Sequence, residues 1–91
     1  MEGDLTDPNI VYSGLSTTIR EGGQDFRVEI FRLEHETAWT LEVVNDKGTS
    51  TVWDEPFATD REALDEMRRT LREEGIVAFL DGGNVIPFRR K

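Results

Sequence analysis

The chain has 91 residues, a formal net charge of −8 and no cysteine. A chain of this length forms a single domain with a thin core, since it buries only about 60–65% of its unfolded surface. The lack of cysteine excludes disulfides and thiolate zinc sites, and the acidic balance argues against general binding to nucleic acid or anionic membranes.

The termini and the hydropathy of the chain predict a cytoplasmic location and the extent of the domain. The amino terminus is acidic and polar, without the basic start and apolar centre of a signal peptide. No apolar run approaches the roughly 20 residues that span a bilayer. We expect residues 1–9 to form a flexible leader, residues 10–88 a single domain and residues 89–91 a short basic tail.

The first half of the domain is predicted to be an antiparallel meander of four strands, at 10–20, 26–34, 37–45 and 49–53. The Gly22-Gly23 pair fits a type I′ hairpin turn, because both central residues of that turn need positive φ. Residues 45–48, Asn-Asp-Lys-Gly, fit a type I turn closed by a glycine bulge. The turn around His35-Glu36 has neither signature, which allows a longer loop.

The turn centres set the strand registers, and these registers agree on one apolar face of the sheet. The aligned residues are Ile19 with Phe26, Ile30 with Leu41, and Val43 with Thr51. The face as a whole collects Leu15, Ile19, Phe26, Val28, Ile30, Trp39, Leu41, Val43 and Trp53. Such a face needs a cover from another element of structure.

Residues 59–76 are predicted to form the helix that provides this cover. Thr59 and Glu62 have the spacing of a capping box, so the Thr59 hydroxyl is expected to accept from the Glu62 N–H. Gly75 is the expected glycine at the end of the helix. An apolar stripe follows from the three- and four-residue spacing of Ala63, Leu64, Met67 and Leu71.

The rest of the helix is charged and is expected to form a solvated surface. Its spacing predicts that Arg69 pairs with Asp65 and with Glu73.

Strands followed by one packed helix make an α+β fold with the order ββββα. After the helix, residues 76–80 are predicted to be a short buried strand, with continued helix as the alternative. Residues 85–88 contain Pro87, which restricts them to an edge strand or an extended tail.

Residues with catalytic or ligand-binding chemistry are few. His35 stands between Glu34 and Glu36, but neighbouring strand residues point to opposite faces and cannot converge on one ion. The serines lack a recognisable nucleophile elbow or base, and the Gly-Gly turns lack the lysine of a phosphate loop. The sequence therefore predicts no catalytic residue, no metal site and no cofactor.

The second face of the sheet offers the main functional signal. Most of it is polar, but Tyr12, Phe31, Leu33 and Ala38 converge at one end, with Tyr12 opposite Leu33 and Leu33 opposite Ala38 in the predicted registers. An apolar patch of this kind needs a cover. The carboxy-terminal segment and a second copy of the chain are favoured over an unrelated partner.

The order of the elements over residues 10–74 resembles that of the PC4-like and Whirly-like single-strand DNA-binding proteins, in which four antiparallel strands precede a helix. The resemblance rests on element order alone. It implies single-strand binding by basic and aromatic residues on the sheet, which here would be Tyr12, Arg20, Arg27 and Phe31.

The sequence thus supports three functional hypotheses. The first is a non-catalytic interaction or regulatory module that self-associates as a homodimer or binds another protein. The alternative is a single-strand nucleic-acid binder, and an enzyme comes third. The membrane is not an expected partner, and nucleic acid is a disfavoured one.

Overall fold

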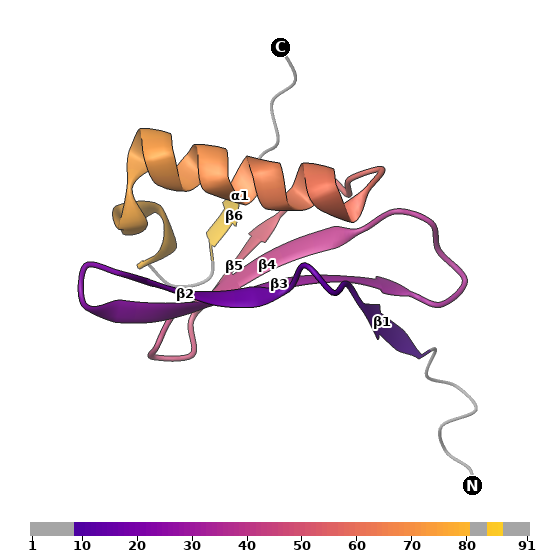
Figure 1. Cartoon of the computed structure of the whole chain (residues 1–91), viewed down its shortest axis with the longest axis horizontal. Coiled ribbons are helices and arrows are strands. Elements are labelled where there is room, and N and C mark those ends of the chain that lie inside the picture. The colour runs from indigo at the N-terminus through magenta and orange to yellow at the C-terminus, as the bar shows by residue number, and fades with distance from the viewer. Residues whose placement is uncertain (1–8, 81–83, 87–91) are drawn as a thin grey trace, which may run out of the picture.

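The computed structural model describes residues 9–80 and 84–86, and it confirms the α+β fold, in which one helix covers one face of a largely antiparallel sheet (Figure 1). The predicted leader, apart from Asn9, and the basic tail lie outside the described residues. The elements are β1 Ile10–Tyr12, β2 Thr17–Glu21, β3 Gln24–Leu33, β4 Thr40–Val44, β5 Ser50–Trp53, the helix α1 Asp60–Glu74, the 3-10 helix η2 Ile76–Phe79, and β6 Asn84–Ile86.

The hairpin registers predicted from the turns are confirmed. The aligned residues are Ile19 with Phe26, Ile30 with Leu41, and Val43 with Thr51. Gly22 and Gly23 have φ of 59° and 78°, as a type I′ turn requires, and Gly48 has φ of 85° in its bulge. The turn residues therefore set which side chains face the helix.

The prediction of one continuous strand over residues 10–20 is wrong, because residues 13–16 leave the ladder and separate β1 from β2. The Ile30 carbonyl accepts from the Ser13 N–H at 2.8 Å, and the Ile30 N–H donates to Ser16 Oγ at 3.1 Å. The Ser16 hydroxyl thus replaces the strand residue that would otherwise pair with Ile30. Residues 13–16 stand opposite only residues 29–30 of β3, so this segment has two extra residues. As a result Tyr12 aligns with Phe31 and not with Leu33.

The core lies between the sheet and α1, as the two apolar patterns predict. Its buried residues are Phe26, Val28, Ile30, Leu41, Val43, Trp53, Phe57, Ala63, Leu64, Met67 and Phe79. Leu15, Ile19, Trp39 and Leu71 pack against it while half-buried. The helix begins as expected, with the Thr59 hydroxyl accepting from the Glu62 N–H at 3.1 Å.

The charged surface of α1 is partly different from the prediction. Arg69 pairs with Glu73 at 2.8 Å as expected, but its other partner is Glu66, at 2.6 Å, and Asp65 instead lies 3.8 Å from Arg61. The reason is that Glu66 faces the core side of the helix and is only 6% exposed. A buried carboxylate needs a charged partner, and Arg69 can provide a bidentate one.

The predicted strand at residues 76–80 is also wrong, although its burial is partly confirmed. Gly75 turns the chain with φ 78° and ψ −179°, a region open essentially only to glycine, and Ile76–Phe79 follows as a 3-10 helix. The turn buries the Phe79 ring 6.0 Å from Phe26 and 6.1 Å from Trp53 and leaves Val77 exposed. Asn45 holds it there by donating from Nδ2 to the Phe79 carbonyl at 3.1 Å.

The last strand, β6, pairs parallel with β5 at the edge of the sheet away from β1. This agrees with the expected edge position near Pro87, although residues 87–88 lie outside the described residues. Parallel neighbours need a long crossover, and α1 supplies it here. The crossover explains why the helix lies across one face of the sheet and why, among the described residues, the other face consists of strands alone (Figure 1).

Candidate interaction surface

The sheet face opposite α1 carries an apolar cluster that joins β1 to β3. Alternation along β3 places Phe31 and Leu33 on this face, and the register aligns Phe31 with Tyr12 and Leu33 with Ile10. The rings of Tyr12 and Phe31 lie 5.9 Å apart at an interplanar angle of 52°. We call these four residues, Ile10, Tyr12, Phe31 and Leu33, the outer patch.

The two β1 members of the outer patch are unusually open to solvent. Tyr12 is 58% exposed and Ile10 is 50% exposed, whereas Phe31 and Leu33 are half-buried beside them. Ile10 was missing from the patch predicted from the sequence. Its position two residues before Tyr12 places it on the same face, and this spacing could have identified it.

The predicted alignment of Leu33 with Ala38, which placed Ala38 in the patch, is not formed. The ladder between β3 and β4 ends at the pair Phe31 and Thr40, before Leu33 could align with Ala38. The chain between β3 and β4 is a loop of six residues, 34–39, because His35-Glu36 does not support a tight turn. Ala38 instead lines a cavity of about 540 Å³ together with His35, Trp53 and Pro56.

Most of the described carboxy-terminal segment lies away from the outer patch. Phe79 of η2 packs into the core on the helix side of the sheet, and Asn84–Ile86 extends the opposite edge as β6. The carboxy-terminal segment was one of the two covers favoured from the sequence. Its described part therefore does not lie over the outer patch.

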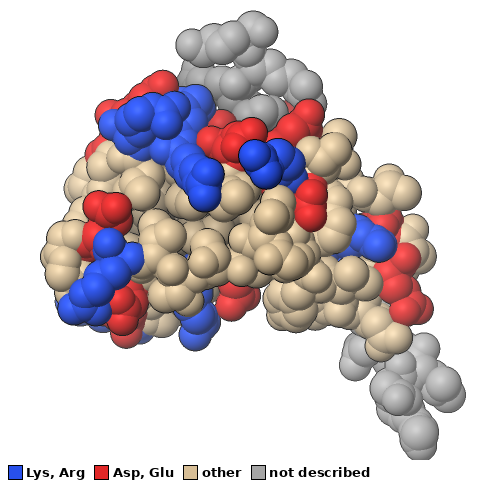
Figure 2. All heavy atoms as spheres, in the orientation of Figure 1, with Lys and Arg blue, Asp and Glu red and all other residues tan. Residues whose placement is uncertain are grey.

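The basic residues expected to contact nucleic acid are already paired with carboxylates. Arg20 donates to Asp25 at 2.7 Å and Arg27 lies 3.3 Å from Glu29. Both arginines lie in the β2–β3 hairpin, whereas Tyr12 and Phe31 lie toward the other end of β3. On the side shown in Figure 2, basic and acidic side chains are intermixed over the helix and at both ends of the sheet, with uncharged residues between them.

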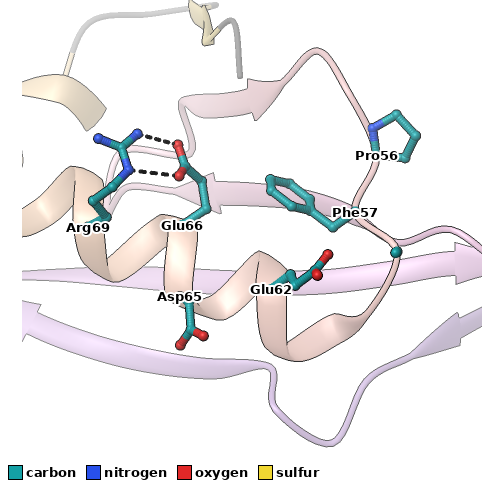
Figure 3. Close-up of a pocket in the computed structure, with 7 residues that line it drawn as sticks. Pro56, Phe57, Glu62, Asp65, Glu66 and Arg69 are labelled. Carbon is teal, nitrogen blue, oxygen red and sulfur yellow. Dashed lines mark hydrogen bonds and ion pairs between the residues drawn. The ribbon is translucent and has the colours of Figure 1, made fainter. Parts of the chain in front are cut away.

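A separate groove of about 340 Å³ lies between α1 and the loop that precedes it. Its lining residues are Pro56, Phe57, Ala58, Glu62, Asp65, Glu66 and Arg69. Figure 3 shows Phe57 beside the ion pair of Glu66 and Arg69, with Asp65 pointing away from that pair. The groove therefore combines an apolar wall with a bidentate ion pair.

The buried carboxylate in this groove already accepts from several donors. Glu66 accepts from Trp53 Nε1 at 3.1 Å and from Arg69 Nε at 2.9 Å and Nη2 at 2.6 Å. The hydrogen bonds that Arg69 donates to Glu66 raise the pKa of Arg69 above its ordinary value. The helical spacing could have indicated this position, because Glu66 follows Ala63 by three residues and precedes Thr70 by four, which places it beside the buried stripe. Its bonds give it a structural role.

Across residues 9–80 and 84–86, no three histidine, cysteine or acidic side chains cluster to hold an ion. Within the same residues, no helix combines the length and the apolar character needed to cross a bilayer. Comparison of the chain with protein-family models, curated proteins and solved structures finds no match.

Proposed function

We propose that the protein is a non-catalytic interaction module that self-associates through the outer patch. The observation that carries this proposal is the 58% exposure of Tyr12 beside Phe31 and Leu33 on the sheet face away from α1. Contiguous apolar groups on a surface mark interaction sites more often than isolated ones do. Covering them removes apolar area from water, which stabilises association by about 25 cal/mol per Å².

Electrostatics and patch size both favour weak association. Each copy carries a net charge of −8, so two copies repel one another at low ionic strength. Four side chains are also few beside the roughly 20–30 residues per side of a standard stable interface. We therefore expect a dimer that dissociates on dilution and that salt strengthens by screening the repulsion.

The other two hypotheses have less support. An enzyme would need several reactive side chains that converge on one site, whereas Glu66, the most buried carboxylate among the described residues, is held by Trp53 and Arg69. A nucleic-acid binder would need free cations, whereas Arg20 and Arg27 each lie beside an acidic partner. No specific observation favours either function over self-association.

Backbone amide spectra recorded over a dilution series test this proposal. Signals from Ile10, Tyr12, Phe31 and Leu33 should shift with protein concentration, because their surroundings change when the patch is covered. Signals from the exposed surface of α1, such as that of Arg68, serve as the control and should stay constant. Concentration-independent signals at all four patch residues would contradict the proposal.

A further inference from the structure

The hydrogen bonds of β1 show which of its backbone groups face away from the sheet. Ser13 donates to the Ile30 carbonyl at 2.8 Å, and Glu34 donates to the Asn9 carbonyl at 2.9 Å. In an antiparallel ladder the residues that bond to a given neighbour alternate. Residues 9, 11 and 13 therefore bond toward β3, and the N–H and C=O groups of Ile10 and Tyr12 point to the opposite side of β1.

That opposite side is a sheet edge. Among the described residues, β3 is the one strand that pairs with β1. Exposed edges are usually protected by charge, by a bulge or by a covering element, because unpaired backbone groups can bind another strand. The sequence of β1 is Ile-Val-Tyr, which has no charge, no proline and no glycine. This edge therefore lacks side-chain protection.

The neighbouring edge strand, β2, differs from β1 because it carries charged residues. It ends in Arg20 and Glu21, and the Arg20 guanidinium is fixed across the hairpin by Asp25 and by the Gly23 carbonyl. The bulge at residues 13–16 separates the two strands, so an added strand on β1 need not extend along β2. Edge pairing is thus expected on β1 and disfavoured on β2.

We propose that β1 pairs antiparallel with β1 of a second copy, about a two-fold axis that passes beside Val11. This inference rests on the proposed self-association and specifies its geometry. With the axis at Val11, Ile10 of each copy faces Tyr12 of the other. Both residues present an outward N–H and C=O, so the pairing forms four hydrogen bonds and leaves none of these groups unpaired.

The same geometry explains why the partner is a second copy. A two-fold pairing requires a strand that is complementary to itself, and the alternation of Ile10 and Tyr12 about Val11 meets that requirement. A slip of one residue would present the groups of Val11, which already bond toward β3. Pairing also places Ile10 and Tyr12 of both copies on one sheet face, which joins the two outer patches into a continuous surface.

Two variants at Ile10 separate the backbone contribution from that of the side chain. Ile10→Pro removes the outward N–H, and the first residue of an edge strand tolerates proline. Ile10→Ala removes most of the same apolar side chain and keeps the N–H. Because Ile10→Pro deletes two of the four intermolecular hydrogen bonds, the dimer dissociation constant should rise at least about tenfold above that of Ile10→Ala.

Sedimentation of both variants and of the unchanged chain gives the deciding comparison, with circular dichroism and thermal melting showing that each variant is folded. A wild-type dimer with equal dissociation constants for the two variants would overturn the edge pairing and leave the proposed self-association standing. A wild-type monomer at every concentration would overturn both.

Amide exchange gives a second measurement that needs no variant. The Ile10 and Tyr12 amides should exchange slowly at high protein concentration and become at least about tenfold faster on dilution to the monomer, because they lose their intermolecular hydrogen bonds. The Val11 amide, which bonds within the chain, should be protected at both concentrations. Fast exchange of Ile10 and Tyr12 in a demonstrated dimer would rule out the edge pairing.

Discussion

Trp53 donates from its indole Nε1 to Glu66 Oε2 at 3.1 Å, which links the last residue of β5 to the buried side of α1. The same carboxylate binds Arg69 through two further hydrogen bonds. This cluster joins the sheet to the helix through polar contacts at the border of the apolar core.

Replacement of Glu66 tests how much this link stabilises the fold. Glu66→Ala leaves the buried indole N–H without its acceptor and removes one carboxylate partner from Arg69, so the free energy of unfolding should fall by about 1–3 kcal/mol. Urea denaturation measures the change. Glu74→Ala, at an exposed position of the same helix, is the matched control and should change stability by less than about 0.5 kcal/mol. Equal effects of the two substitutions would show that the buried carboxylate contributes little.

Ser16 tests the interruption between β1 and β2. Its hydroxyl accepts from the Ile30 N–H at 3.1 Å and lies 3.2 Å from the Ile30 carbonyl. Ser16→Ala leaves the Ile30 N–H without this partner and should cost about 1–3 kcal/mol in chemical denaturation. Thr18→Ala lies at an exposed position of β2 and should cost less. A loss for Ser16→Ala no larger than that for Thr18→Ala would mean that water or a local shift satisfies Ile30.

The pairing of the two arginines leads to a prediction about nucleic acid. Titration of the protein with a labelled single-stranded oligonucleotide at low salt should show no binding at micromolar concentration, because Arg20 and Arg27 lie beside carboxylates and the chain is acidic. Saturable binding that weakens steeply with salt would contradict this prediction. It would also make the resemblance in element order functionally relevant.

Much of the fold was predictable because turn chemistry and periodicity act locally. Gly22, Gly23 and Gly48 set the hairpin registers through their positive φ. The spacing of Ala63, Leu64 and Met67 identified the buried side of α1. These patterns depend on a few neighbouring residues, which a sequence displays directly.

The features that sequence reasoning missed depend on contacts between distant segments. The interruption at residues 13–16 relies on Ser16 bonding to Ile30, and the burial of Glu66 relies on Trp53 and Arg69. The 3-10 helix after Gly75 similarly relies on the contact of Phe79 with Asn45. Polar partners of this kind override local pattern once the chain has folded.

The candidate site was predictable in part, because alternation along a strand is also a local pattern. Tyr12, Phe31 and Leu33 share one face by simple alternation, so they were found despite the shift in register. The predicted pairing of Leu33 with Ala38 is absent because it depended on the extent of a hairpin whose turn has no clear signature. Whether the carboxy-terminal segment covers the patch was not predictable, because this depends on the path of the chain after Gly75.

Sedimentation equilibrium over a wide range of protein concentration tests self-association through the outer patch most directly. The chain should approach twice its mass of 10.4 kDa at high concentration and dissociate on dilution. Tyr12→Ser should raise the dissociation constant about tenfold or more, because it removes the most exposed apolar side chain of the outer patch. Val77→Ser alters a side chain that is 62% exposed on η2 and should leave the constant unchanged. A single 10.4 kDa species at every concentration, or equal effects of the two substitutions, would contradict self-association through the outer patch.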